Sequence, residues 1–510
     1  MATLAASGTS SDDFGAWIYP VKWADPVLTY AFPDNVTDFD YLSGDPLSQL
    51  SAAQQASARR ALAQVESFTN LGFQESADHA AATLRFVAKA DEPTASAYYP
   101  NAFDSGGDGF FGPETRDPTP GNYAEFTFIH ELGHMLGLEH AHEAAGFGGS
   151  ALDSTEFTVM SYAAFVGDAH DGYRNETGGF AQSFMQLDIA ALQFLYGADH
   201  SASGRIWSGD TVYTFDPGTG EMSINGEGQG RPEANRIFRT IWDGHGEDTY
   251  DLGNYTTALQ LDLRPGAWST FSQAQLADLD FSSDSAARMA RGNLANARLY
   301  QGDLRGLIEN AIGGTKADEI IGNQGANRLE GRAGRDTILG EAGDDTILGG
   351  QHGDTLRGGA GDDLVLGGNG ADLLWGDDGA DRLKGLNGND DLRGGKGADV
   401  LIGGAGQDIL RGHAGADVFM FMKVSDSAEA AGYDRILDAV SGRDVLDFSS
   451  VANNLTLSIG GGLVAGSRTL ATRERDGNTI ISVDIDRDGA ADMKVLALDV
   501  TGLTESDFLI

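Results

Sequence analysis

Hydrophobic residues in the first 200 positions recur mainly at helical spacing, interrupted by short runs typical of strands. Residues 46–68 follow an Asp-Pro start and predict one long helix or two abutting ones, which end before Asn70-Leu71-Gly72. Two further helices are predicted at 126–138 and at 183–196, the second ending at Gly197. Short β-type runs lie at 28–32, 83–88 and 97–99. This part therefore predicts an α+β unit of about 200 residues.

After Gly197 the helical pattern nearly disappears, and Gly, Asp and Asn become frequent. Residues 211–215, 249–252 and 259–263 predict short strands between turns. From 313 to 421 the chain repeats every nine residues, with Asp at 11 of 12 equivalent positions and Asn327 at the other. Two residues after each of these positions the side chain is apolar in all 12 repeats. So strict a period predicts a stack of identical short strands.

The chain is strongly acidic. The chain carries 76 Asp and Glu against 34 Lys and Arg, for a net charge of -42, and 71 Gly. Such an excess of carboxylates repels a phosphate backbone, so we expect no nucleic-acid partner. There is no Cys, so we expect neither a disulfide that stabilises the fold nor a thiol that takes part in the chemistry. No apolar run of about 18 residues predicts a membrane span, and residues 1–15 lack the pattern of a Sec signal peptide.

The segment from His130 to His140 reads HELGHMLGLEH. On a helix, His130 and His134 stand on one face and can share a metal ion. Gly137 allows the chain to leave the helix, so that His140 can reach the same ion. Three protein ligands with one open position are typical of catalytic Zn²⁺, and Glu131 is placed to act as the general base toward a water molecule. We interpret His142 and Glu143, which follow at once, as facing solvent.

The repeat indicates a calcium site of a different kind. Its Gly residues permit tight turns, its Asp points into the turn, and its apolar residue starts a strand that faces inward. Asp residues 18 apart then stack about 4.8 Å from one another, where two carboxylates repel by roughly 3 kcal/mol at an effective dielectric constant of 20. Ca²⁺ bound between turns reverses this repulsion. A flexible Gly- and Asp-rich linker is the alternative, but a linker needs no apolar residue in register. We expect the repeats with Lys316, Asn327 and His352 to bind weakly or not at all.

The extended histidine motif, followed by Met160-Ser161-Tyr162, resembles the signature of the metzincins. Together with residues 184–197 and 308–314, it makes nearly the whole chain similar to the serralysin family of bacterial extracellular proteases. The resemblance implies one catalytic Zn²⁺ held by His130, His134 and His140, and Glu131 as general base. It implies that Met160 lies beneath the metal and that Tyr162 is a displaceable ligand that binds the oxyanion. The connection from His140 to Met160 is shorter than the family's usual one, at the border of the substrate pockets.

The resemblance also implies several structural calcium ions. One set lies outside the repeats and comprises Trp207, Gly209, Thr211, Asp243, Gly246 and Asp248. A second comprises Glu309, Gly314 and Asp318, although Leu307 and Lys316 replace the family's usual Thr and Gly. The repeats supply Gly334, Asp336, Gly343, Asp345, Asp354, Gly361, Asp363, Gly370, Asp372, Gly379, Asp381, Gly388, Asp390, Gly397, Asp399, Gly406, Asp408 and Asp417.

These patterns predict a multidomain protein, with an α+β metzincin catalytic domain followed by an all-β parallel β-roll. The expected parts are a tail or pro-segment (1–15), a zinc protease domain (16–200), a β-rich connection (201–312), the roll (313–421) and a C-terminal β cap with a secretion signal (422–510). The expected function is zinc-dependent hydrolysis of internal peptide bonds of extracellular proteins. A non-catalytic calcium-dependent adhesin is the alternative. An RTX lipase is disfavoured, because no Gly-x-Ser-x-Gly motif is present.

The resemblance further predicts export and partners. Asp507 followed by Phe508, Leu509 and Ile510 is similar to the family's type I secretion signal, so a type I secretion apparatus and an extracellular location are expected. The alternative is that these apolar residues merely close the last strand. Expected partners are protein or peptide substrates and a proteinaceous protease inhibitor, and the protein is expected to be a monomer.

Overall fold

The computed structural model describes residues 3–5, 15–42, 46–201, 209–281, 288–428 and 432–510. The chain forms two compact units, residues 1–250 with 265–308 and residues 251–264 with 309–510. Within the described residues no helix is long and apolar enough to cross a membrane. The domain boundaries drawn from the sequence stay predictions. The tail predicted at 1–15 falls largely outside the described residues, although Thr3–Ala5 forms the strand β1.

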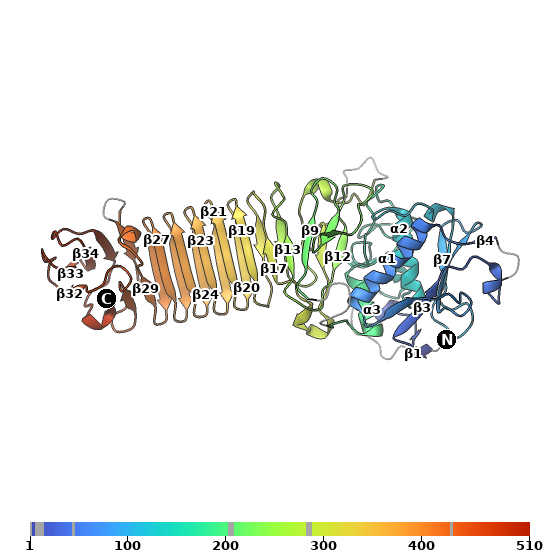
Figure 1. The fold of residues 1–510 in the computed structure, drawn as a ribbon, viewed down its shortest axis with the longest axis horizontal. Coiled ribbons are helices and arrows are strands. Elements are labelled where there is room, and N and C mark those ends of the chain that lie inside the picture. Colours follow the sequence, from blue (N-terminus) through green and yellow to red (C-terminus); the bar gives the residue numbers. More distant parts are fainter. Residues whose placement is uncertain (1–2, 6–14, 43–45, 202–208, 282–287, 429–431) are drawn as a thin grey trace. The chain divides into compact units, whose positions relative to one another are not determined.

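The first unit contains three α-helices among its described residues, α1 (Ala52–Phe68), α2 (Tyr123–Met135) and α3 (Gln186–Tyr196). Its main sheet has the order β5-β3-β6-β8-β7, with β4 paired to β6. The strands of this sheet are β3 (Val27–Ala31), β4 (Leu47–Ser48), β5 (Gly72–Glu75), β6 (Leu84–Lys89), β7 (Ala95–Ala97) and β8 (Asp108–Phe111). Figure 1 shows the three helices beside this sheet. Buried aromatic and aliphatic side chains fill the space between them, with Phe111 stacked on Phe128 at 4.1 Å.

The start of α1 corrects the sequence-based prediction. The helix begins at Ala52, and residues 47–48 form β4 instead of helix. The side chain of Ser51 accepts a hydrogen bond from the backbone N–H of Gln54, and Gln54 caps Ser51 in return. This capping box gives hydrogen-bond partners to two backbone N–H groups at the start of the helix, which favours a start at Ala52. Asp45, the predicted N-cap, lies outside the described residues.

The rest of the first unit is built from short strands. They are β1 (Thr3–Ala5), β2 (Val21–Trp23), β9 (Val212–Phe215), β10 (Met222–Ile224), β11 (Glu227–Gly228), β12 (Arg239–Ile241), β15 (Trp268–Ser269) and β16 (Leu294–Asn296). Strands β9, β10 and β11 form an antiparallel ribbon, and β12-β16-β15 forms a separate sheet. Strand β13 comprises Thr249–Asp251, and the first segment of the first unit ends within it in the sequence, at Tyr250.

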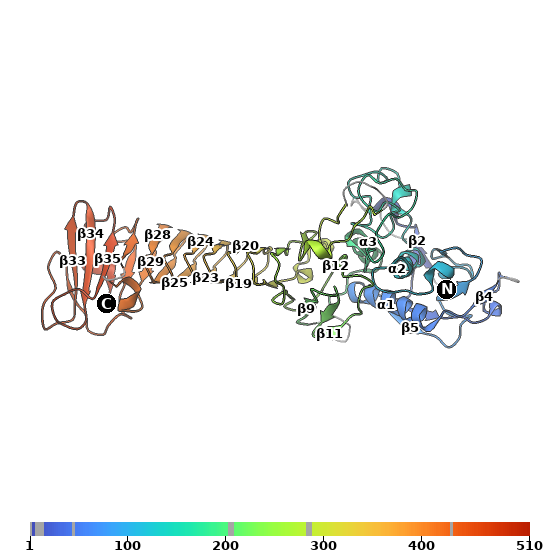
Figure 2. The same ribbon diagram turned by 90° about the horizontal axis from the view of Figure 1, so that it is seen from above.

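The second unit is a parallel roll with a mixed cap. Alternate repeats enter two sheets, one in the order β17-β19-β21-β23-β25-β27-β29-β31-β36 and the other in the order β14-β18-β20-β22-β24-β26-β28-β30-β35-β34-β33-β32. Figure 2 shows these sheets as two layers. The strands of the first sheet are β17 (Asn310–Ile312), β19 (Arg328–Ala333), β21 (Thr346–Gln351), β23 (Leu364–Asn369), β25 (Arg382–Asn387), β27 (Val400–Ala405), β29 (Val418–Met420), β31 (Val445–Asp447) and β36 (Phe508–Leu509). Those of the second are β14 (Gln260–Asp262), β18 (Glu319–Ile321), β20 (Thr337–Ala342), β22 (Thr355–Ala360), β24 (Leu373–Asp378), β26 (Asp391–Lys396), β28 (Ile409–Ala414), β30 (Asp434–Ile436), β32 (Thr456–Ser458), β33 (Thr469–Arg475), β34 (Asn478–Asp484) and β35 (Met493–Ala497).

The apolar residue of each repeat forms the core of the roll. All 12, from Ile320 to Phe419, have 0% of their surface exposed. Burying one such side chain stabilises the fold by about 1.5–3 kcal/mol, so the register is fixed by the apolar column. Residues 18 apart pair in neighbouring strands, as Ile338 does with Leu356. The parallel β-roll and the α+β unit confirm the predicted fold class.

Candidate metal centres

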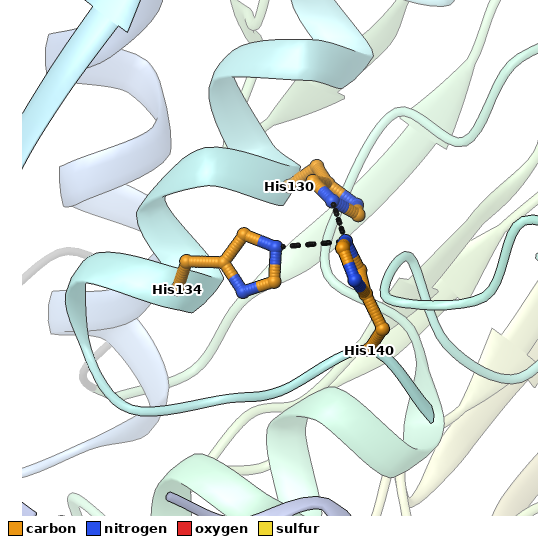
Figure 3. A group of neighbouring side chains, drawn as sticks. All are labelled: His130, His134 and His140. Carbon is orange, nitrogen blue, oxygen red and sulfur yellow. Dashed lines mark hydrogen bonds between the residues drawn. The ribbon is translucent and has the colours of Figure 1, made fainter. Parts of the chain in front are cut away.

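Helix α2 positions the first two histidines of the motif. Its N-cap Asn122 accepts a hydrogen bond from the backbone N–H of Glu125, and the helix ends one residue after His134. Gly137 has φ of 104°, a conformation that other residues resist, and it turns the chain back toward the helix. His140 then reaches the same point from another direction (Figure 3).

The three imidazoles converge on one point through their Nε2 atoms. The Nε2 atoms of His130 and His140 are 3.3 Å apart, and those of His134 and His140 are 3.1 Å apart. The edge of a tetrahedron around Zn²⁺ is about 3.3–3.4 Å for Zn–N bonds of about 2.0–2.1 Å, so both spacings fit a shared metal.

Backbone contacts fix the tautomers of two of these rings. The Nδ1 atom of His130 lies 2.7 Å from the carbonyl of Val159, and that of His134 lies 2.7 Å from the carbonyl of Leu138. Because a carbonyl only accepts, each Nδ1 carries the proton and each Nε2 presents a lone pair. Burial lowers the pKa of His130 to about 3 and also lowers that of His134 well below its usual value. Both rings are therefore neutral, as metal ligands must be.

Glu131 lies next to His130 in the sequence but does not belong to the histidine cluster. Its carboxylate is buried, and its Oε2 atom has no hydrogen-bond partner among the described residues. Burial, with a smaller contribution from Glu92, raises the pKa of Glu131 to about 8. A perturbed pKa is typical of residues at functional sites, and the unsatisfied Oε2 atom is free to accept a hydrogen bond from a water molecule in the cavity.

Residues 158–162, which we call the Met-turn, lie beside the histidines, and the carbonyl of Val159 contacts the ring of His130. Met160 is fully buried, and its Sδ lies so close to Gly133 of α2 that a side chain there would collide with it. The ring of Tyr162 lies 4.6 Å from that of His140, and burial raises the pKa of Tyr162 to about 12. The structure thus brings His130, Glu131, His134, His140, Met160 and Tyr162 together, as the sequence predicts.

His142 differs from its prediction. It is half-buried instead of facing solvent, and its ring lies between Tyr162 at 4.5 Å and His170 at 4.8 Å. The short loop after His140 is the reason, since it folds His142 back over the Met-turn. Glu143 is exposed as predicted, with its carboxylate 3.6 Å from Nδ1 of His140.

A cavity of about 430 Å³ opens beside His130, Glu131 and Tyr162. Its other walls include four aromatic side chains, Tyr123, Phe126, Tyr173 and Phe180, and residues Thr94 and Ala95 at the start of β7. Strand β7 is the last strand of its sheet among the described residues, so its outer edge can pair with an extended chain. It covers residues 95–97, slightly before the predicted 97–99. Tyr99 instead stacks on Tyr19 and meets the ring of His134 edge-on at 5.3 Å.

The roll carries ladders of buried Asp residues. From Asp318 to Asp399 the backbone N–H of each ladder Asp donates to Oδ1 of the Asp 18 residues further on, as Asp363 does to Asp381 at 2.9 Å. The other oxygen, Oδ2, has no hydrogen-bond partner within the described residues for ten of them, Asp336, Asp345, Asp354, Asp363, Asp372, Asp381, Asp390, Asp399, Asp408 and Asp417. Burial is the largest cause that raises the pKa of Asp381 to about 7, and the neighbouring carboxylates raise it further. A row of buried, unsatisfied carboxylate oxygens fits the ligands of Ca²⁺.

Asn327 occupies a ladder position but makes different contacts from the Asp residues. Its Nδ2 donates to Asn323 at 3.1 Å, and its Oδ1 accepts from the backbone N–H of Asn323 at 2.7 Å. The side-chain amide of Asn327 thereby has hydrogen-bond partners within the protein, whereas the Oδ2 atoms of the neighbouring Asp residues have none among the described residues.

The ladders continue beyond the repeats through two residues that the nine-residue period does not reveal. Asp434 accepts from the backbone N–H of Asp408 at 2.9 Å, and Asp444 accepts from that of Asp417 at 3.1 Å. Arg443 binds the carboxylate of Asp444, whereas Asp434 and the nearby Asp426 each keep one buried oxygen without a partner among the described residues. A search for Asp two residues before an apolar residue, with no fixed period, would have found Asp434, because Ile436 follows it at that spacing.

The two other predicted calcium sets are partly assembled. Thr211 donates its backbone N–H to Asp248 at 2.9 Å, and a side chain at Gly246 would collide with the carbonyl of Gly209. Asp243 accepts a hydrogen bond from Tyr213 at 2.7 Å, and its Oδ1 has no hydrogen-bond partner among the described residues. Trp207 lies outside those residues. In the second set, Gly314 donates to Asp318 at 2.7 Å, and Glu309 directly precedes β17.

Comparisons with known proteins find a repeat family and several homologous proteases. Residues 312–347, 348–383 and 384–419 match the family model of the RTX calcium-binding nonapeptide repeat. The chain is 29% identical to Serralysin G of Dickeya chrysanthemi over 58% of its length, and 30% identical to Serralysin C of the same organism over 44%. It is 27% identical to Metallopeptidase AprA of Pseudomonas marginalis over 58%. The matches span 58%, 43% and 59% of these relatives, less than two thirds of each.

Proposed function

Because the chain is a homologue of the serralysins and carries RTX calcium-binding repeats, we propose that it is a secreted zinc-dependent endopeptidase. It would hydrolyse internal peptide bonds of extracellular proteins. The observation that carries this proposal is the convergence of three Nε2 atoms beside the buried carboxylate of Glu131. The residues 16–200 would form the protease domain, and 201–312, 313–421 and 422–510 the connection, the roll and the cap.

Each residue of the centre has a role in this reaction. His130, His134 and His140 would hold Zn²⁺, which when bound polarises the scissile carbonyl and acidifies water. Glu131 takes the proton of the attacking water and returns it to the leaving amine. Tyr162, with a pKa near 12, stays protonated and donates its O–H to the developing oxyanion.

The walls of the centre suit a peptide substrate. An extended chain can add to the free edge of β7, where backbone hydrogen bonds would hold it across the histidines. The adjacent cavity is lined by Tyr123, Phe126, Tyr173 and Phe180, so it favours a large apolar side chain next to the scissile bond.

Digestion of casein with and without a zinc chelator tests the proposal. We expect cleavage that the chelator abolishes and that a stoichiometric amount of Zn²⁺ restores, in the continued presence of millimolar Ca²⁺. Calcium must be held constant because loss of the roll would also lower activity. Cleavage that persists after the zinc has been removed would exclude this mechanism.

Calcium has a structural role in this proposal. The buried Oδ2 atoms of the two ladders would bind ions together with backbone carbonyls, and Asp426 and Asp434 would extend the binding beyond the repeats. The number of ions then depends on how many repeats keep the Asp, so Asn327 would weaken its own turn.

Export by a type I secretion apparatus completes the proposal. It rests on Asp507 followed by three apolar residues and on a roll that can stay unfolded where calcium is scarce. Phe508 and Leu509 form β36, paired with β31, but Leu509 and Ile510 remain 52% and 40% exposed. Replacing both exposed residues with Ser should stop export through a coexpressed type I transporter without unfolding the cap. Normal accumulation of this variant in the medium would place the signal elsewhere.

A further inference from the structure

A second cavity, of about 100 Å³, lies in the first unit where α1 meets β10 and β12. Arg60 and Gln64 of α1 line it on one side, and Met222 of β10 and Arg239 of β12 line it on the other. Both charged residues among its described lining are arginines. This is unexpected in a chain with 76 acidic and 34 basic residues, because an arginine in such a chain would normally have an acidic side chain nearby.

Arg239 has weak partners in this cavity. It is partly buried, and its guanidinium donates to Sδ of Met222 at 2.9 Å and to the carbonyl of Gln182 at 3.4 Å. No carboxylate lies within ion-pair distance of it among the residues that the structure describes. Burial lowers the pKa of Arg239 to about 10, which reflects the cost of keeping this charge away from water. A guanidinium has five donors, so most of its binding capacity is unused.

Arg60 has a different environment. Glu125, whose side chain is only 5% exposed, holds it in a two-pronged ion pair at 2.9 and 2.6 Å. This pair neutralises Arg60 and fixes its orientation, while the pair uses only two of its nitrogens. The cavity therefore keeps one uncompensated positive charge, on Arg239, next to a second guanidinium that is held in place.

We propose that this cavity binds a small oxyanion of the sulfate or phosphate type, with Arg239 as its principal ligand and Arg60 as a second. Planar guanidinium groups match the oxygens of such ions by paired hydrogen bonds. A volume of about 100 Å³ admits one such ion but neither a peptide nor a nucleotide. The bound ion would join α1 to β10 and β12, and so stabilise the unit that carries the histidine centre.

Thermal unfolding and calorimetry of the full calcium-loaded chain test this site, with the Glu131→Gln substitution present throughout to prevent self-digestion. Sulfate is titrated against chloride at constant ionic strength. We expect a saturable rise in the unfolding midpoint of about 2–4 °C and a binding stoichiometry of one sulfate per chain. Arg239→Met should abolish both effects. Arg357→Gln, which alters a 58% exposed arginine of the roll, should leave both unchanged.

Arg239→Lys separates charge from geometry, because it keeps the cation and loses the paired donors. We expect it to weaken sulfate binding without abolishing it. An equal response to sulfate in the parent protein and in Arg239→Met would show a general salt effect and overturn the proposal. A failure of the parent protein to bind sulfate in calorimetry would overturn it as well.

Discussion

Asp188 accepts a hydrogen bond from the backbone N–H of Val159 at 2.8 Å, and the carbonyl of the same Val159 lies 2.7 Å from Nδ1 of His130. The carboxylate of Asp188 also accepts from the hydroxyl of Thr158 and from the backbone N–H of Met185, and it is fully buried. The first turn of α3 thereby holds the Met-turn, and the Met-turn holds a histidine of the centre. Asp188 is a positioning residue that touches no reacting atom.

Replacing Asp188 by Ala should therefore loosen the metal centre. Three buried donors would lose their acceptor, and the peptide that orients His130 would be free to move. We expect zinc affinity to fall by about 10- to 100-fold, as it does when an outer partner of a metal ligand is removed. Competition with a fluorescent chelator measures this change. Asp171→Ala, at an exposed site, is the control, and equal zinc affinity in both variants would contradict the role assigned to Asp188.

Replacing Glu131 by Gln should separate binding from chemistry. The amide keeps the size of the side chain but cannot take a proton, so zinc content should stay at one ion per chain. The value of kcat should fall by about 10²–10⁴ or more. Metal analysis and cleavage of a quenched peptide measure the two quantities. Exposed Glu114→Gln should leave both unchanged, and near-normal turnover in Glu131→Gln would rule out this residue as the base.

Tyr162→Phe tests the oxyanion contact. The ring can keep its contact with the ring of His142, whose centroid lies 4.5 Å away, while the O–H donor disappears. Because this donor acts in the transition state, we expect kcat to fall by about 10²–10³ with little change in KM or in zinc content. An increase in KM at unchanged kcat would instead assign Tyr162 to substrate binding.

The predictable parts of this molecule are those in which local sequence determines geometry. His130, His134 and His140 could be grouped because helical spacing and Gly137 fix their directions. The roll could be predicted because every repeat has the same sequence pattern as the next. The role of Asp188 could not be found, since its partner Val159 lies 29 residues away and no spacing rule connects the two. The burial of His142 depends on how one short loop folds back. Asp434 follows the last repeat at an irregular distance, so the period that reveals the other ladder residues does not reach it.

Removing calcium should unfold the roll, because the fold places ten buried carboxylate oxygens without partners among the described residues. Circular dichroism of the full chain should lose most of its β signal in excess chelator and regain it with millimolar Ca²⁺. A substitution within the ladder sharpens the test. Asp381→Asn should raise the calcium concentration at the midpoint of refolding by on the order of ten-fold, since it removes a charged ligand. The control is Asp362→Asn, at an exposed position of a neighbouring turn.

The opposite substitution, Asn327→Asp, should add a calcium ion. Asn327 occupies the ladder position in which its amide and Asn323 satisfy each other, at 3.1 Å. An Asp there cannot donate to Asn323, so its free oxygen would face the turn as those of Asp336 and Asp345 do. Mass spectrometry under native conditions should count one ion more than in the parent protein. The apo form should be less stable than the apo parent, because one more buried carboxylate repels its neighbours. An unchanged ion count would show that the carboxylates of the ladder do not by themselves determine where calcium binds.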